Sequence, residues 1–212
     1  MKGDNAVCRC LARTAAAVLL ESQDLIKNGT VQASGLLDLL FKAASHPSVY
    51  VCGIAVEALA AIAPSNSELS TRLLPYLQGK AIIPFHLIRD VDGSLDDYTN
   101  FRDRVLADAF IACYTGCSSF YLESCGSAIE EFCQAIPSPH LPYQLEAALF
   151  CMIAVSERAS KEPDKQVLCG QLEKMVSALA KNSFSTTSHP LVMAKMCRFI
   201  NKVRGDSAMI AI

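Results

Sequence analysis

The chain has 212 residues, which is long enough for one compact domain or for several short repeats stacked in a row. Hydrophobic residues make up 51% and charged residues only 19%, so much of the chain must be covered by itself or by neighbours. The formal net charge is -2, with 19 basic and 21 acidic residues intermixed, which excludes a strong electrostatic footprint for nucleic acid or an anionic membrane. Partners are therefore expected to be proteins.

The cysteines and the apolar runs favour a reduced, soluble protein. No uncharged apolar run reaches the roughly 18 residues that a membrane-spanning helix needs, and residues 1–5 do not begin a secretion signal. We expect an intracellular protein without membrane contact. Its ten cysteines are expected to be reduced thiols, mostly on the apolar faces of helices; they are Cys8, Cys10, Cys52, Cys113, Cys117, Cys125, Cys133, Cys151, Cys169 and Cys197.

Apolar residues recur at the 3.6-residue period of amphipathic helices along the whole chain. In the first part this pattern predicts helices over about 6–27, 30–44, 47–63 and 67–79. Thr30 is a candidate N-cap of the second helix, and Pro47 is expected at the first position of the third, where its missing N–H costs nothing.

An acidic stretch follows over residues 89–97. It does not match an EF-hand calcium loop. If Asp90 is counted as the first position of the loop, Gly93 is the fourth, whereas an EF-hand loop has its glycine at the sixth position. We interpret it as a solvated loop that ends in an acidic helix start, where Asp96 or Asp97 caps the following amides.

The second part of the chain continues the helical pattern. Helices are predicted over about 98–115, 120–136, 141–158, 168–179 and 190–203. In the first of these, Arg102 and Arg104 are expected to face solvent. The helix from residue 141 is apolar on most sides and is expected to lie between neighbouring helices.

The helix starts at Pro47, Asp96, Pro142 and Pro190 are spaced by about 48 residues. Two helices per unit at roughly this length are typical of HEAT or armadillo arrays, and no stretch shows the alternation of a strand. The predicted fold class is all-α, an α-solenoid of stacked antiparallel helix pairs. Residues 1–212 would form one solenoid segment, with approximate repeats 6–46, 47–95, 96–141 and 142–189 and a half repeat 190–204. Neither end has a polar cap, so we expect a segment of a longer solenoid or a truncated gene product.

Three segments resemble one known family. Residues 101–105, Phe-Arg-Asp-Arg-Val, follow the acidic loop, residues 145–154 read Leu-Glu-Ala-Ala-Leu-Phe-Cys-Met-Ile-Ala, and Ser45-His46-Pro47 follows the Leu-rich run 36–41. In these segments the chain resembles the karyopherin-beta (importin-beta-like) nuclear transport receptors, in particular the transportin-SR and importin-thirteen branch. It departs from the family at 56–59, which reads Val-Glu-Ala-Leu where the family commonly has a Phe-Trp pair.

The resemblance implies a receptor whose curved solenoid carries protein cargo through nuclear pores under control of the small GTPase Ran. Such a protein occurs in both cytoplasm and nucleus. The family binds Ran and nucleoporins largely through amino-terminal repeats, so these partners would be contacted through the full-length parent. The resemblance carries over no functional residue to this chain.

Catalytic, cofactor and metal sites find no support in the sequence. A cysteine nucleophile needs a histidine base and an exposed electropositive site, and Cys8-Arg9-Cys10 lacks the spacing of a zinc site. His46, His140 and His189 stand at helix junctions next to or near proline, where they are expected to serve the turns. We therefore predict no enzyme activity.

Exposed acidic residues are the candidate protein-binding site, because a basic or Arg/Ser-rich cargo signal needs an acidic surface. The alternative interpretation of the same residues is an ordinary solvated face. A second function is left open, a scaffold or adaptor subunit of a larger complex, and neither the cargo nor the direction of transport follows from the sequence. The candidate residues are Asp90, Asp92, Asp96, Asp97, Glu130 and Glu131.

Overall fold

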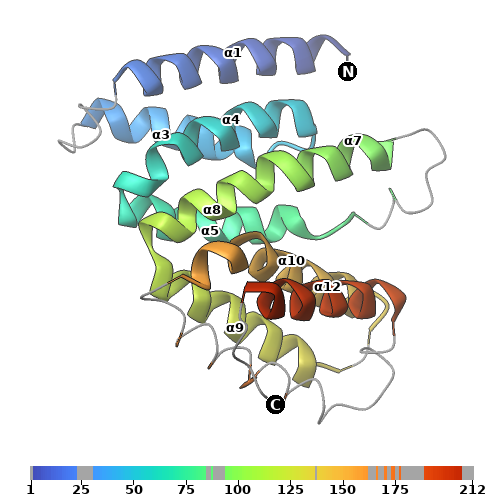
Figure 1. The fold of residues 1–212 in the computed structure, drawn as a ribbon. Helices are drawn as coiled ribbons and strands as arrows, with labels where there is room; N and C mark the ends of the chain where they lie inside the picture. The colour runs from blue at the N-terminus through green and yellow to red at the C-terminus, as the bar shows by residue number, and fades with distance from the viewer. Residues whose placement is uncertain are drawn as a thin grey trace. The chain divides into compact units, whose positions relative to one another are not determined.

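The computed structural model describes residues 2–22, 31–84, 87, 94–136, 138–161, 166, 170, 173–174, 177 and 189–206. All regular structure in these residues is helical, and no strand occurs among them (Figure 1). The predicted all-α class is confirmed for this part of the chain. The predicted N-cap Thr30, the loop from 89 to 93 and most of the predicted helix over 168–179 lie outside the described residues.

The helices follow the apolar periodicity closely, since most of their ends lie within a few residues of the prediction. A short 3-10 turn, η1 (Ala63–Ser65), follows α4, and a π-helical turn, η2 (Arg102–Leu106), joins α7 to α8. The helices are α1 (Lys2–Glu21), α3 (Val31–Ala44), α4 (Val49–Ile62), α5 (Ser67–Ala81), α7 (Ser94–Phe101), α8 (Ala107–Gly116), α9 (Ser118–Gln134), α10 (Leu141–Ala159) and α12 (Pro190–Asp206).

The chain divides into two compact units. The first consists of Met1–Leu77 and Asp90–Cys117, and the second of Gln78–Arg89 and Ser118–Ile212. The division falls inside α5, after Leu77. The predicted repeat boundaries are a finer division of the chain and stay a prediction.

In the first unit, α4 lies at the centre. Glu57 is its single charged residue, and α1 and α3 pack on one side of it while α7, η2 and α8 pack on another. The Phe101 ring packs beside Gly53, and a Cβ added to this glycine would lie 3.8 Å from the ring, at an ordinary van der Waals distance. A separate contact joins α3 to α5, where Arg72 pairs with Asp38 at 2.6 Å and stacks 4.3 Å from the centre of the Phe41 ring.

In the second unit, α10 is the central helix, as its apolar sequence predicted. It packs on α9 and on α12, and it is buried on most sides. The Tyr121 hydroxyl of α9 donates a hydrogen bond to the Cys151 carbonyl at 2.8 Å, and the Lys202 ammonium of α12 donates one to the Ile153 carbonyl at 3.3 Å. The first of these bonds gives a partner to the Tyr121 hydroxyl, which belongs to a fully buried residue.

Three helices were predicted to start at a proline, and two of these three predictions are correct. Pro190 is the first residue of α12 and Pro142 the second of α10. At Pro47 the prediction is wrong, because Ser48 is the N-cap residue and α4 begins at Val49. Pro47 therefore precedes the cap, where its fixed φ still favours the extended entry into the helix.

The prediction that Arg102 faces solvent is also wrong, since only 5% of this residue is exposed. The cause is η2, in which the backbone bonds follow the i→i+5 pattern of a π-helix. The wider turn brings Phe101 and Leu106, five residues apart, to the buried side together, and Arg102 with them. Arg104 and Asp103 remain exposed.

Candidate protein-binding site

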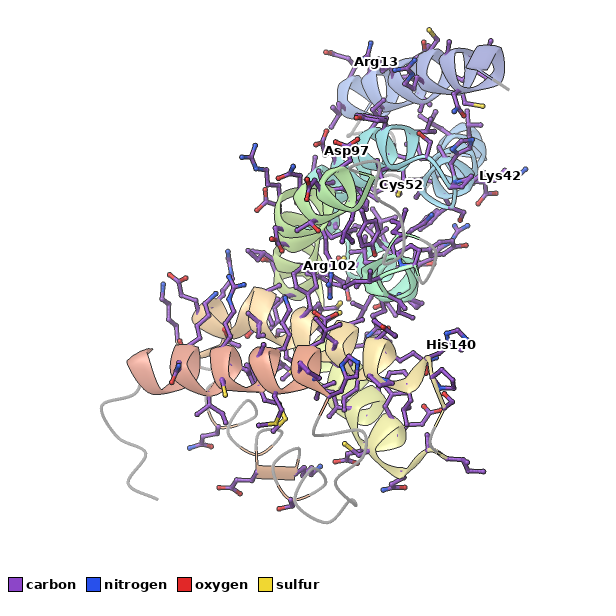
Figure 2. All side chains as sticks on the ribbon, turned by 90° about the vertical axis from the view of Figure 1, so that its right-hand side faces the viewer. Arg13, Lys42, Cys52, Asp97, Arg102 and His140 are labelled. Carbon is purple, nitrogen blue, oxygen red and sulfur yellow. The ribbon has the colours of Figure 1, made fainter. Side chains whose placement is uncertain are left out.

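The acidic start of α7 is the part of the candidate site for which the structure gives geometry. Asp96 and Asp97 lie in the first turn of α7, where negative charge is stabilised by the positive end of the helix dipole, and both are exposed. Figure 2 labels Asp97 on this helix. The helix itself begins at Ser94, four residues before the predicted start. The prediction that Asp96 or Asp97 is the capping residue is therefore wrong, because both lie inside the first turn of the helix. Asp90 and Asp92 lie outside the described residues.

Asp97 is linked to a residue far away in the sequence. It accepts a hydrogen bond from the Tyr50 hydroxyl of α4 at 3.1 Å, across 47 residues of chain. This hydrogen bond and the negative charge of Asp97 raise the pKa of Tyr50 above its usual value, while the nearby Arg9 of α1 acts in the opposite direction. Three helices of the first unit thus bring a cation, a phenol and a carboxylate together on an exposed surface.

The remaining candidates belong to the second unit. Glu130 and Glu131 lie near the end of α9, with Glu131 exposed and Glu130 half-buried. Glu130 is close enough to Cys133 for its charge to raise the pKa of that thiol, in addition to the larger effect of burial. An acidic residue near a helix C-terminus is not stabilised by the helix dipole, unlike Asp96 and Asp97.

A buried charged pair in the second unit was missed by the sequence reasoning. Glu146 of α10 is 1% exposed, and its carboxylate lies 3.4 Å from the Lys195 ammonium of α12. The same ammonium lies 4.9 Å from the centre of the Phe150 ring. The sequence feature that could have predicted this pair is the single charged residue in the apolar run 145–155. A carboxylate in a helix that is buried on most sides requires a partner.

The histidines serve structural roles where their contacts are defined. His46 Nδ1 accepts a hydrogen bond from the Ser48 amide at 3.1 Å, which confirms the predicted turn role at this junction. His189 lies edge-on to the Tyr143 ring, with the ring centres 5.7 Å apart. Among the described residues, no three His, Cys, Asp or Glu side chains form a group that could hold a metal ion.

The buried cysteines are poorly suited to nucleophilic chemistry. Burial, with a smaller contribution from Cys117, raises the pKa of Cys113 to about 12, so the thiolate is a minor species at neutral pH. Cys52 donates a hydrogen bond to the Ala44 carbonyl at 3.0 Å and is likewise buried. Cys10 and Cys197 are instead exposed.

The rate of alkylation by iodoacetamide is expected to be higher for exposed thiols than for buried ones. At pH 8 we expect Cys10 and Cys197 of the native protein to react first, and Cys113 at least about a hundredfold more slowly, because it is buried and only about one part in ten thousand is ionised. Peptide mapping by mass spectrometry over time measures the three rates. In denaturant the rates should converge; equal rates for Cys10 and Cys113 in the native protein would contradict the assignment.

No helix in the described part of the chain has the length and apolar character needed to span a membrane. Comparisons of the chain with protein-family models, with curated proteins and with solved structures give no match.

Proposed function

We propose that the chain is a protein-binding segment of an α-solenoid, built from stacked pairs of antiparallel helices. Contacts between helices that are two apart along the chain support this architecture. In the first unit α1 packs on α4 and α4 on α8, while α3 contacts α5 through the Asp38–Arg72 pair and the Phe41 and Tyr76 rings. Two rows of alternating helices are what a stack of helix pairs produces, because each helix contacts its counterpart in the next pair.

We further propose that this solenoid is part of a nuclear transport receptor of the importin-beta type, which binds protein cargo and catalyses no reaction. The resemblance of residues 101–105 and 145–154 supports the family. The second of these segments forms the central part of α10, which is more buried than the other described helices of its unit. In the longer parent protein, Ran and nucleoporins would bind, and the receptor would move between cytoplasm and nucleus.

The cargo part of the proposal rests on the exposed carboxylates at the start of α7. Asp96 and Asp97 stand side by side in the first turn, and only Asp97 has a hydrogen bond to Tyr50. Opposite charges at a solvent-exposed surface attract a basic peptide most strongly at low ionic strength, where screening is weak. A cargo with an Arg-rich or Arg/Ser-rich signal fits this surface.

Charge reversal is expected to weaken binding of an Arg-rich peptide. A variant with Asp92→Lys, Asp96→Lys and Asp97→Lys should bind a fluorescent Arg/Ser-repeat peptide at least about threefold less tightly at low salt, with a smaller difference at high salt. Fluorescence anisotropy measures the affinity. A matched control reverses the exposed acids Glu57, Glu68 and Glu123, which changes the net charge equally. Unchanged affinity, or an equal loss in the control, would count against an acidic cargo site.

The second candidate function, a scaffold or adaptor subunit of a larger complex, is favoured by the same stacked packing. Binding of GTP-loaded Ran by the full-length parent separates the two candidates. A transport receptor binds Ran in the GTP form and not in the GDP form, whereas a scaffold binds neither form.

A further inference from the structure

Tyr50 is an exposed aromatic residue beside the acidic start of α7. It lies in the first turn of α4, and 59% of the residue is exposed to solvent. Its hydroxyl donates a hydrogen bond of 3.1 Å to Oδ2 of Asp97, which Figure 2 labels on α7. Within the described residues, Oδ1 of Asp97 has no hydrogen bond. The bond joins two helices of the first unit and holds the ring next to a carboxylate that can still accept a donor.

The same chain shows how a carboxylate and an aromatic ring together hold a cation. Arg72 of α5 pairs with Asp38 at 2.6 Å, and its guanidinium lies 4.3 Å from the centre of the Phe41 ring. The contact between α10 and α12 has the same arrangement with a lysine as the cation. In both places the carboxylate and the negative face of the ring attract the same positive charge.

At Tyr50 and Asp97 these two groups are together without a cation between them. Among the described residues, no cationic side chain forms an ion pair with Asp97 or stacks on the Tyr50 ring. The hydrogen bond to Asp97 raises the pKa of Tyr50, and Arg9 of α1 is close enough for its charge to act in the opposite direction. The Nε of Arg9 itself donates a hydrogen bond to the Asn5 carbonyl at 3.3 Å. The ring and the carboxylate are therefore both available to a cation of a partner.

Arginine fits such a pair better than lysine does. A guanidinium is planar and carries its N–H groups at the edge, so it can stack on a ring while it donates hydrogen bonds to a carboxylate. An ammonium is a compact and strongly hydrated charge, which gains less from an exposed ring. The negative charge of Asp96 and Asp97 alone does not distinguish the two cations.

We propose that Tyr50 makes the acidic surface at the start of α7 selective for arginine over lysine in a basic peptide. The guanidinium of one arginine stacks on the Tyr50 ring and donates to Oδ1 of Asp97, while Asp96 adds negative charge. The nearby charge of Arg9 repels the incoming cation and limits the affinity. This inference rests on the proposed cargo site, to which it adds a residue of α4.

Two peptides of equal length and charge test the role of Tyr50. A fluorescent Arg/Ser-repeat peptide is compared with a Lys/Ser-repeat peptide, using the full chain at low ionic strength. By fluorescence anisotropy, the Arg peptide is expected to bind about two- to fivefold more tightly, which is the size of effect that an exposed stacking contact produces. Tyr50→Leu should remove this difference by weakening the Arg peptide alone. Tyr50→Phe should keep most of it, because the ring remains.

Two further variants locate the contact. Arg9→Gln should tighten the binding of both peptides, because it removes a positive charge close to Tyr50. Phe120→Leu makes the same kind of change at an aromatic residue of α9 that is 43% exposed, and as the control it should change neither affinity. Circular dichroism establishes that each variant folds.

The proposal is overturned if the original chain binds the two peptides equally, if Tyr50→Leu keeps the preference for arginine, or if it weakens both peptides by the same factor. When these results occur but charge reversal at Asp92, Asp96 and Asp97 still weakens both peptides, the cargo site stands and only the role of Tyr50 is wrong. When neither peptide binds, or charge reversal has no effect, the cargo site is wrong and the role of Tyr50 is wrong with it.

Discussion

A Gly116→Ala variant is expected to lose about 2 kcal/mol or more of its free energy of unfolding. Gly116 is the last residue of α8 and lies directly against η1 and α5. A Cβ at this position would overlap the Ser70 Oγ and would lie only 2.5 Å from the Ala63 carbonyl oxygen. These two groups are themselves joined by a hydrogen bond of 2.7 Å, so neither can move without breaking it. Urea unfolding followed by circular dichroism measures the loss.

Two other glycines provide matched controls for the same substitution. Gly35 in α3 and Gly79 in α5 have no atom within 4 Å of an added Cβ. Alanine there should raise the free energy of unfolding by about 0.5 kcal/mol, because alanine favours helix and restricts the unfolded chain. Combining Gly116→Ala with Ser70→Ala should recover only part of the loss, since the Ala63 carbonyl remains. A Gly116→Ala variant as stable as the original protein would contradict the close contact.

A Lys195→Met variant is expected to lose about 2 kcal/mol, although it keeps the length and apolar body of the side chain. The ammonium lies 3.4 Å from the Glu146 carboxylate, of which only 2% is exposed, and the lysine side chain is 19% exposed. Without this cation, the buried Glu146 carboxylate keeps its negative charge between α10 and α12 but loses the positive charge that stabilises it. Replacing both residues, as in Glu146→Leu with Lys195→Met, should recover most of the lost stability.

The surface pair of Arg72 and Asp38 is the control for this effect. Its atoms are closer, at 2.6 Å, but its side chains are 48% and 57% exposed. Asp38→Ala should change the free energy of unfolding by less than about 1 kcal/mol, because water solvates each charge when the other is absent. Equal losses for Lys195→Met and Asp38→Ala in urea unfolding would show that burial does not govern the strength of these pairs.

The positions of the helices were predictable because they depend on nearby residues. The 3.6-residue period in α9, α10 and α12 predicted their extents to within a few residues, and the apolar character of α10 predicted its central place in its unit. Acidic residues at a helix start predicted the location of Asp96 and Asp97 in the first turn of α7. The prediction failed at Arg102, because a π-helical turn breaks the period that the prediction assumed.

The sequence alone determined the helical class, the approximate helix boundaries and the acidic start of α7, since backbone geometry and helix dipoles act over a few residues. Only the tertiary structure decided which charges are paired. Tyr50 meets Asp97 and Glu146 meets Lys195 because helices distant in sequence pack against each other. The tertiary structure also decided that one apolar face of α1 is buried and the other exposed, because both faces are apolar and only the presence of α3 and α4 distinguishes them.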